Sequence, residues 1–568
     1  MSTSSTPSYD TPVLIAGGGP AGLTAALLLA RQGISPLLVE RHAGTSIHPR
    51  ARGLNVGTME ILRVLGLEGD VRDAGAALAA SRYMLFVDTL AGEEIRRVPD
   101  ADLLPVGDAL ARVTPCDWGR CAQDELEPIL AAAARAHGAD LRFNTKLVSF
   151  SQDADGVSAT LADRATGMRR AVRAQYLVAA DGAHSPVRAA LGVPMTGVGP
   201  VSRGQLGHFV NVYFRADLSE LVRGREFILC FVERPGTEGL LLAVNNSDRW
   251  LFNVAYDPTR GETPDAFTPA RCVALIRAAI GLPDLDVEIL SVLPWEGAAL
   301  IADRFRVGRA FLVGDAAHVT PPAGGFGLNT GVQDAHNLTW KLALVLAGVA
   351  DPALLDTYEA ERRPVARVVV DRAVREIAAP TPDAAPTWDA SGQDGPEDGA
   401  WGDDEDKSDP LAQLPPILGY RYDSRAIVAE EGTNQADALP KGLDLTGRPG
   451  TRAPHVWVER AGRHISTLDL FDGRFVLLAG AEGGAWPHAA HSVAASLGLS
   501  LDSYCVGVAG DLTDRDRDWG AAYGVTPTGA VVVRPDGTVG WRSAGSVGAP
   551  AEELERALPR LLCRKLQH

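Results

Sequence analysis

Positive charge, and lysine above all, is scarce in this chain of 568 residues. Lys and Arg number 54 against 71 Asp and Glu, which gives a formal net charge of −17, and only five of the basic residues are Lys. An acidic protein gains no electrostatic attraction to nucleic acid or to anionic lipid. We therefore expect neither nucleic acid nor a membrane surface as a partner.

Cysteine is also rare, and no two cysteines form a C-x-x-C pair or join histidines at zinc-ligand spacing. The six are Cys116, Cys121, Cys230, Cys272, Cys505 and Cys563. We expect no metal site and no dithiol centre. Unpaired thiols are typical of the reducing cytoplasm, which is the expected location.

Long apolar runs are missing as well. The best candidate, 338–350, is interrupted by Lys341 and falls short of the ~20 residues of a membrane span. The N-terminal MSTSSTPSYDT has no basic region followed by an apolar stretch, so we expect no signal peptide. With 46% hydrophobic and 22% charged residues, the composition predicts a globular protein whose length requires two or three domains.

Negative charge is concentrated in the segment 378–410, which holds ten Asp or Glu and one Lys. The segment is rich in Pro, Gly and Asp and has almost no apolar periodicity. Such a composition predicts a solvated linker.

Residues 11–40 show the strand, turn, helix, strand order of a βαβ unit. An apolar strand at Thr11–Ala16 precedes a helix at Leu23–Arg31, and a second strand at Pro36–Val39 ends in Glu40. The turn between the first strand and the helix reads Gly17-x-Gly19-Pro20-Ala21-Gly22. Glycines there let the backbone approach a pyrophosphate at the helix N-terminus, and the acid is placed for ribose hydroxyls. The unit predicts a dinucleotide site, because a purely structural turn would not require the acid.

Two later segments repeat the pattern of a strand that ends in Gly and Asp. Leu177–Ala180 runs into Asp181-Gly182, and Phe311–Val313 runs into Gly314-Asp315. The second is followed by a proline- and glycine-rich loop and a helix expected to begin near Thr330. Only one G-x-G-x-x-G occurs, which argues against a separate fold for NAD(P)H.

These three fingerprints, between residues 17 and 329, resemble those of the group A FAD-dependent aromatic monooxygenases, the class of para-hydroxybenzoate hydroxylase. The resemblance implies that Asp315 contacts the FAD ribitol and that the Gly325–Asn329 backbone holds the pyrimidine edge of the flavin ring. Free N–H groups at that helix N-terminus would stabilise the anionic reduced flavin. The candidate residues for FAD are Gly17, Gly19, Pro20, Ala21, Gly22, Glu40, Arg41, Arg50, Arg52, Gln123, Asp181, Gly314, Asp315, Pro322, Gly325, Gly327, Leu328 and Asn329.

Some of these assignments have a plain structural alternative. Arg50 and Arg52 follow the second strand, and they either hold the pyrophosphate or ring edge or simply face solvent before the next helix. Gln123 opens a helix and matches a family position on the FAD phosphate. His184 and His318 beside the fingerprints are interpreted as turn caps, and no residue is identified as catalytic.

Residues 205–256 alternate with period two and predict an antiparallel sheet of their own. Its strands are expected at His208–Phe214, Phe227–Val232, Leu240–Val244 and Trp250–Tyr256. The substrate pocket is expected between this sheet and the flavin. Its candidate residues are Asn211, Tyr213, Trp250, Phe252 and Trp295, although aromatic residues in such positions serve an ordinary core equally well.

The tail, 411–568, predicts a third, small α/β domain. The stretch from Tyr523 to Arg542 resembles the thioredoxin-like tail of phenol hydroxylase and of the larger aromatic polyketide hydroxylases. By that resemblance Pro527 occupies the place of a cis-proline. The region Gly480–His488 has no Cys, so the domain is expected to be redox-silent.

The expected fold class is thus α/β and α+β: a Rossmann-like FAD-binding domain interleaved with an antiparallel substrate domain, plus a thioredoxin-like domain. The expected limits are 1–190 with an inserted strand segment near 80–100, 191–298, 299–377, the linker 378–410, and 411–568.

The resemblance implies tightly bound, non-covalent FAD, with NAD(P)H as transient reductant. O2 would form a flavin C4a-hydroperoxide that hydroxylates a polycyclic aromatic, polyketide-type phenol, and a base or hydrogen-bond acceptor near the pocket would favour the reaction. Two alternatives remain open: Baeyer–Villiger oxidation of a polycyclic ketone, and binding of flavin or an aromatic ligand without turnover. The chain is expected to be a monomer or homodimer.

Overall fold

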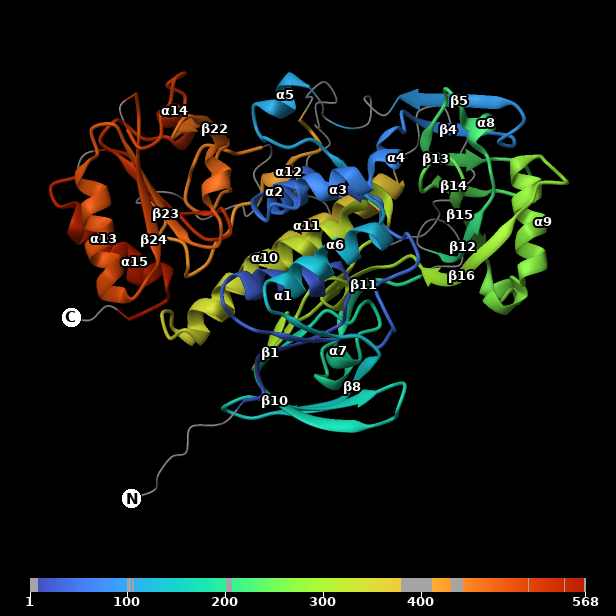
Figure 1. Cartoon of the computed structure of the whole chain (residues 1–568), viewed down its shortest axis with the longest axis horizontal. Coiled ribbons are helices and arrows are strands. Elements are labelled where there is room, and N and C mark those ends of the chain that lie inside the picture. The colour runs from blue at the N-terminus through green and yellow to red at the C-terminus, as the bar shows by residue number, and fades with distance from the viewer. Residues whose placement is uncertain are drawn as a thin grey trace.

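Three lobes make up the computed structural model, which describes residues 9–99, 104, 107–200, 207–378, 411–430, 443–508, 510–545 and 547–565. We call them the central domain, the sheet domain and the C-terminal domain. In Figure 1 the green strands of the sheet domain and the orange C-terminal domain lie on opposite sides of the central domain. The acidic segment 378–410 lies, after Ala378, outside the described residues.

The central domain is built on an eight-stranded sheet. The core order is β18-β19-β10-β1-β2-β7, with β8 and β9 continuing from β10. Strands β19, β10, β1, β2 and β7 are parallel, and the apolar runs of β1, β2, β19 and the end of β10 reflect burial on both faces. The strands are β1 (Thr11–Ala16), β2 (Leu37–Val39), β7 (Asp140–Arg142), β8 (Thr145–Gln152), β9 (Val157–Asp163), β10 (Arg169–Ala179), β18 (Arg306–Val307) and β19 (Ala310–Leu312).

Helices and two short sheets complete the central domain. The helices are α1 (Pro20–Arg31), α2 (Val56–Val64), α3 (Glu68–Ala74), α4 (Ala76–Ala79), α5 (Asp108–Ala111), α6 (Gln123–Ala136), α7 (Pro186–Ala190), α10 (Phe326–Leu346) and α11 (Asp356–Ala378). The short sheets pair β3 (Gly53–Leu54) with β6 (Gly119–Arg120), and β17 (Ala299–Ala302) with both β11 (Met195–Val198) and β20 (His318–Val319).

Helix α10 begins at Phe326, four residues before the predicted start near Thr330. Gly324 and Gly325 adopt left-handed conformations, with φ of 71° and 64°, and turn the chain directly into the helix. The prediction was wrong because this backbone turn is not visible in side-chain periodicity.

The sheet domain contains a seven-stranded sheet in the order β16-β12-β15-β14-β13-β4-β5. Its strands are β4 (Tyr83–Val87), β5 (Glu94–Pro99), β12 (His208–Arg215), β13 (Phe227–Val232), β14 (Gly239–Ala243), β15 (Arg249–Tyr256) and β16 (Glu288–Glu296); its helices are α8 (Ser219–Val222) and α9 (Pro269–Ile280). The segment near 80–100, expected as an insertion in the FAD-binding domain, instead pairs with β13 through β4. It therefore extends the sheet domain.

The register of β12 and β15 decides which side chains share a face. Directly paired residues point the same way, so Phe252 lies with Val212, and Trp250 lies with Phe214. All four belong to the core that α9 covers, where Trp250 and Phe252 are 0% and 1% exposed. Trp250 and Phe252 were wrongly predicted to line the pocket, because the paired faces follow from register and not from alternation within one strand.

The C-terminal domain has a four-stranded, thioredoxin-like sheet in the order β24-β23-β25-β26. Its strands and helices are β21 (Trp457–Arg460), β22 (Arg463–Ser466), β23 (Phe475–Gly480), β24 (Leu501–Val506), β25 (Ala530–Val533), β26 (Val539–Ser543), α13 (Ala485–Leu497), α14 (Trp519–Tyr523) and α15 (Pro550–Leu561). Cis peptide bonds are absent from the described residues, so Pro527 follows a trans bond, contrary to the resemblance. All six cysteines are free thiols.

The segment before this domain packs on the central domain. Helix α12 (Pro415–Leu418) and Tyr422 join a cluster with Phe326 and Val365 of α10 and α11. The tail expected to begin at residue 411 thus starts with a segment, 411–422, that packs across the central domain; we call this segment the strap.

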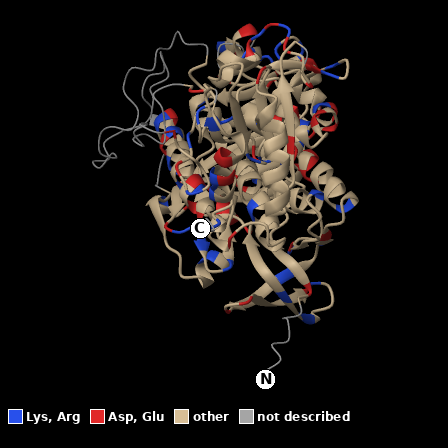
Figure 2. Ribbon diagram, turned by 90° about the vertical axis from the view of Figure 1, so that its left-hand side faces the viewer, with Lys and Arg blue, Asp and Glu red and all other residues tan. Residues whose placement is uncertain are grey.

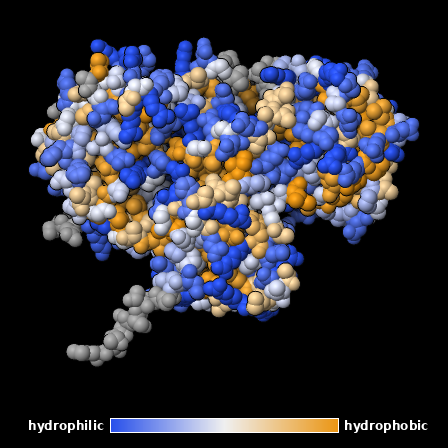
Figure 3. Space-filling model, in the orientation of Figure 1, coloured by the Kyte–Doolittle hydropathy of each residue, from blue (hydrophilic) through white to orange (hydrophobic). Residues whose placement is uncertain are grey.

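Residues of opposite charge are intermixed along the chain in the view of Figure 2. Hydrophilic and hydrophobic residues alternate across the face in Figure 3. Within the described ranges, no helix is long and apolar enough to cross a membrane, and no cluster of metal-ligating side chains is found.

Candidate active site

The first glycine turn has no room for side chains where it meets its neighbours. A Cβ on Gly17, whose φ is +109°, would lie 2.1 Å from the Ala180 carbonyl oxygen, and one on Gly22 would lie 2.0 Å from the Gly17 oxygen. A Cβ on Gly19, by contrast, would meet nothing within 4 Å. Helix α1 begins at Pro20 without a side-chain cap, so its first N–H groups face this open space. The turn therefore forms an anion cradle.

Glu40 lies at the edge of this cradle, directly after β2. Its Oε2 accepts a hydrogen bond from the Gly18 N–H at 2.7 Å, and its Oε1 accepts one from the His42 N–H at 2.8 Å. The carboxylate is thus held beside the turn, as ribose recognition requires.

The Gly314-Asp315 turn contacts the first fingerprint. Gly314 has a φ of +60°, and a Cβ there would lie 3.2 Å from the Ala21 Cβ and 3.5 Å from the Gly331 Cα. The turn is thereby clamped between α1 and α10. The Asp315 side chain is exposed within a protein-lined hollow; the surrounding protein raises the pKa of its carboxyl, while His318 and Arg50 oppose that rise.

Asp334 on α10 fixes this turn through hydrogen bonds. Its Oδ2 accepts from the Gly314 N–H at 3.2 Å and contacts the His318 Nε2 at 2.6 Å, and its Oδ1 accepts from the Arg362 Nε at 2.7 Å. All three side chains are fully buried. His318 therefore supports the turn, and Asp334 and Arg362 were missed by sequence reasoning, although a charge inside the apolar α10 was a visible signal.

The Asp181-Gly182 segment joins the same turn. Asp181 accepts hydrogen bonds from the Ser185 hydroxyl and the Val187 N–H at 2.5 and 3.1 Å. Arg188 donates to the Ala316 carbonyl at 2.9 Å, next to Asp315. The three fingerprints thus converge on one place.

The loop before α10 completes the groove. Added Cβ atoms on Gly325 and Gly327 would meet nothing within 4 Å, so their backbone borders open space. Asn329 is 2% exposed; its Oδ1 accepts from the Asn55 N–H at 2.9 Å, and its Nδ2 donates to the Gly53 and Gly325 carbonyls at 3.2 and 2.7 Å. The Asn329 side chain therefore fixes the loop, which leaves its backbone to face a ligand. Leu328 in this loop is half-buried, and Pro322 before it is exposed.

The basic and amide candidates lie in different surroundings. Arg41 and Arg50 are exposed beside the groove. Arg52 is buried and donates to the Ile228 and Ala243 carbonyls of the sheet domain at 2.8 and 2.6 Å, and burial, followed by Arg120, lowers its pKa to about 9. Its guanidinium thus points away from the glycine turn. Gln123 donates to Glu127 at 2.7 Å at the start of α6.

The face of β12 opposite the core forms a second side of the candidate site. Tyr213 on this face contacts the His48 ring edge-on at 5.8 Å between centroids. Trp295 stacks on Phe209 at 4.5 Å and donates through Nε1 to the Asn253 Oδ1 at 2.9 Å. This face presents flat aromatic surface together with polar side chains.

Unpartnered polar atoms occur at this junction of two domains. The Asn211 Oδ1 and both ring nitrogens of His48 are buried and have no hydrogen-bond partner among the described residues. Burial, aided by Arg50, lowers the pKa of His48 to about 4, so its ring is neutral at pH 7. Buried groups without partners are costly, which indicates that a ligand satisfies them.

The anion cradle, the acid at the end of β2, and a helix N-terminus facing the same groove define a flavin-dinucleotide-binding protein, and the residues present fit FAD. The comparisons agree. A family model described as FAD binding domain matches residues 10–373, and one described as aromatic-ring hydroxylase, C-terminal, matches residues 446–564.

Similar proteins extend over nearly the whole chain. Tetracenomycin A2 monooxygenase-dioxygenase of Streptomyces glaucescens is 42% identical over 98% of this chain and 97% of its own. 4-methyl-5-nitrocatechol 5-monooxygenase of Burkholderia sp. is 41% identical over 98% of both chains. The crystal structure of aklavinone-11 hydroxylase with FAD and aklavinone matches with a TM-score of 0.83 and 39% identity, covering 98% of this chain and 100% of that one.

The chain therefore belongs to the FAD-dependent aromatic-ring hydroxylases. It is a flavoprotein monooxygenase with an FAD-binding domain and an aromatic-ring hydroxylase C-terminal domain. The resemblance recognised in the sequence is confirmed at the level of family, fold and cofactor.

We predict that Asp315→Ala loses most of its FAD, because the variant removes the exposed carboxylate at the convergence of the three fingerprints. Flavin content of the purified protein and the FAD dissociation constant are the measurements. The matched control is Asp356→Ala. It removes an exposed carboxylate at the start of α11 that pairs with Arg306 of β18. Full flavin content in the Asp315 variant would contradict this placement of the site.

Because His48 is buried and neutral, we predict that the free energy of unfolding falls in acid. Its pKa is about 4 in the folded protein against an ordinary 6.5, so the neutral ring contributes stability above pH 6.5 that is lost as the pH falls towards 4. At pH 4.5 the loss amounts to about 2–3 kcal/mol. His48→Phe keeps the edge contact with Tyr213 but does not titrate; urea unfolding at pH 7.5 and 4.5 should therefore show a smaller acid loss than in the wild type. Equal losses in both proteins would refute the buried, neutral His48.

Proposed function

We propose that this enzyme hydroxylates a polycyclic aromatic phenol of the polyketide type, using NAD(P)H and O2. The carrying observation is the face of β12 and β16 that lies towards the flavin groove, where Phe209 and Trp295 stack beside the unpartnered Asn211 oxygen. Stacked aromatics suit a flat, multi-ring ligand. Relatives named for acting on tetracenomycin and aklavinone support the same substrate class.

The assignment of the FAD-binding residues is part of this proposal. The cradle at Gly17–Gly22 and Arg50 would hold the pyrophosphate, and Glu40 would bind the adenosine ribose. Asp315 would contact the ribitol, and the Gly325–Asn329 backbone would face the pyrimidine edge of the ring. Arg52, Asp181 and Gln123 would act behind these groups, since their side chains are engaged by protein atoms.

FAD, once reduced, supplies the activated oxygen for the reaction. The protein's part is to bind, orient and polarise. The Asn211 Oδ1 would accept a hydrogen bond from the substrate's phenol, which raises the electron density of the ring. His48 is neutral at pH 7 and lies against Tyr213, so its ring can accept a hydrogen bond where the sheet domain meets the central domain. The uncapped N–H groups at the start of α10 would stabilise negative charge on the bound flavin.

Arg249 would keep Tyr213 in place for this role. Its Nε donates to the Tyr213 hydroxyl at 2.7 Å, and its NH1 donates to Glu125 at 2.9 Å. Asp124 accepts a third hydrogen bond from the same guanidinium. The aromatic face is thereby anchored to the start of α6.

We also propose that the enzyme works in the cytoplasm, as its free thiols and its reductant favour, and that it is a monomer or homodimer. The proposed partners are the aromatic substrate and O2, with no nucleic acid and no membrane.

The test is a screen of NAD(P)H oxidation and product mass against anthraquinones, naphthacenes and one-ring phenols. We predict substrate-dependent oxidation and a product one oxygen heavier for multi-ring phenols. One-ring phenols are included because one relative is named for acting on 4-methyl-5-nitrocatechol. A preference for one-ring phenols would overturn the proposed substrate class. A shifted carbonyl resonance in the product would indicate Baeyer–Villiger oxidation instead, and ligand binding without oxidation would indicate a non-catalytic protein.

The pocket face makes its own prediction. Asn211→Leu should raise KM for the substrate about tenfold, because it removes the buried acceptor, and should leave the free energy of unfolding nearly unchanged. The matched control is Phe252→Ala on the opposite face of the sheet. It should lower the free energy of unfolding by about 3–5 kcal/mol and leave KM unchanged. The reverse pattern would show that the two faces have been assigned wrongly.

A further inference from the structure

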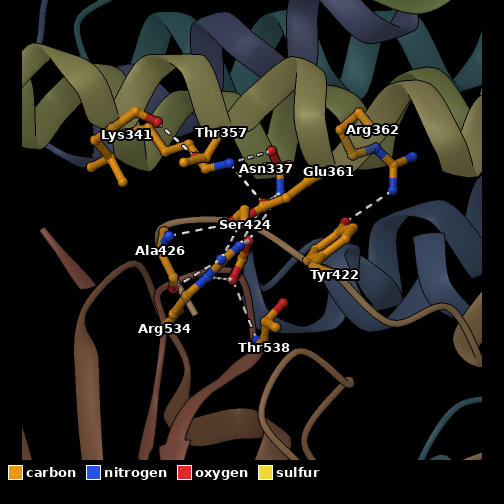
Figure 4. Close-up of polar contacts among 12 residues, drawn as sticks. Asn337, Lys341, Thr357, Glu361, Arg362, Tyr422, Ser424, Ala426, Arg534 and Thr538 are labelled. Carbon is orange, nitrogen blue, oxygen red and sulfur yellow. Dashed lines mark hydrogen bonds and ion pairs between the residues drawn. The ribbon is translucent and has the colours of Figure 1, made fainter. Parts of the chain in front are cut away.

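A cluster of buried charges joins the central domain to the C-terminal domain (Figure 4). Lys341 of α10, Glu361 of α11 and Arg534 after β25 are all fully buried. Both Glu361 oxygens accept hydrogen bonds from Arg534, at 2.7 and 2.9 Å, and Oε2 also accepts one from Lys341 at 2.7 Å. Asp536, in the turn after Arg534, supplies the second carboxylate, so the cluster is neutral.

The cluster is fully satisfied on both sides of the domain boundary. Asn337 donates to Glu361 at 2.7 Å and to Asp536 at 3.2 Å, and Ser424 donates to the Glu361 Oε1 at 2.6 Å. Burial alone would raise the pKa of Glu361, but Arg534 and Lys341 hold it well below its ordinary value. Glu361 is therefore charged, and it depends on a guanidinium from another domain.

The turn that carries Asp315 is connected to this cluster through adjacent residues. Glu361 and Arg362 follow one another on α11; the first contacts the C-terminal domain, and the second bonds to Asp334, which holds Gly314. On α10, Asp334 and Lys341 are seven residues apart and so lie on one side of the helix.

Tyr422 links the two groups a second time. Its hydroxyl accepts a hydrogen bond from the Arg362 NH1 at 3.0 Å, and its ring lies 5.5 Å from the Arg534 guanidinium. Figure 4 shows Tyr422 reaching Arg362 from the strap while Arg534 approaches Glu361 from the C-terminal domain. The path from Arg534 to Gly314 is thus continuous: Arg534, Tyr422 or Glu361, then Arg362 and Asp334.

We infer that the C-terminal domain sets the geometry of the FAD site, with Arg534 and Tyr422 as positioning residues for the Gly314-Asp315 turn. An attachment role alone would need no buried charge, because apolar contacts such as that of Trp340 with Phe475 already join the domains. The ion cluster adds a fixed register between α10, α11 and the β25–β26 turn. This domain, which has no dithiol, thereby acts on flavin binding through position. The inference rests on the proposed place of Asp315 at the flavin.

The test compares two full-length variants with a control at the same domain boundary. Tyr422→Phe removes only the hydroxyl that Arg362 uses, and Arg534→Lys keeps the charge but loses the two-point contact with Glu361. Asp472→Asn is the control; it breaks the exposed ion pair with Arg31, which also joins the two domains but does not reach Gly314.

We expect the FAD dissociation constant to rise about five- to tenfold in Tyr422→Phe and Arg534→Lys and to stay within about twofold in Asp472→Asn. The hydrogen peroxide released per NAD(P)H should rise in the same two variants, because a displaced turn leaves the flavin misplaced. Melting temperatures of the apoproteins report folding separately. The stabilisation added by saturating FAD should shrink in both variants.

A fall in melting temperature with unchanged FAD affinity and unchanged peroxide release would show a merely structural role and overturn the inference. Failure of the site assignment is distinguishable. In that case Asp315→Ala itself would bind FAD normally, whatever Tyr422→Phe does.

Discussion

The close approach of α1, α10 and the Gly314 turn is the constraint on which the site depends. Gly314 is held between Ala21 and Gly331, so closely that even an added methyl group would lie only 3.2 Å from the Ala21 Cβ. Ala21 belongs to the first fingerprint, whereas Gly314 and Gly331 belong to the third fingerprint and its following helix, so these distant segments can converge only if all three positions stay small. In the proposed assignment, the dinucleotide occupies the open space next to this contact.

Next to the same contact, the central domain buries charged side chains rather than large apolar ones. Asp334 is buried with the Arg362 guanidinium, the His318 ring and one backbone N–H as partners, which compensate the cost of burying a carboxylate. Apolar side chains could fill that volume with similar stability, but they would not fix the direction of the Gly314 N–H. The arrangement therefore provides orientation more than stability.

Sequence reasoning identified what local patterns encode. Strand alternation, the glycine turn and the acid after β2 are all read within about forty residues, and each lies close to where it was expected. The register between neighbouring strands could not be predicted from such local patterns. Trp250 and Phe252 alternate correctly within β15, but only the pairing of Val212 with Phe252 shows that they face α9. Asp334 and Arg362 belong to no motif, because their partners, among them the Gly314 N–H and each other, lie on separate segments of the chain.

The two faces of β12 explain how such a sheet can serve both stability and recognition. Val212 and Phe214 are buried under α9 and fix the strand, while Asn211 and Tyr213 project from the same backbone towards the flavin groove. If Asn211 lines the substrate pocket as proposed, a change there would alter what the pocket accepts without disturbing the core, and a change at Phe214 would do the opposite. Since period-two alternation separates these effects residue by residue, substrate preference in this fold can vary while the strand that positions the substrate stays fixed.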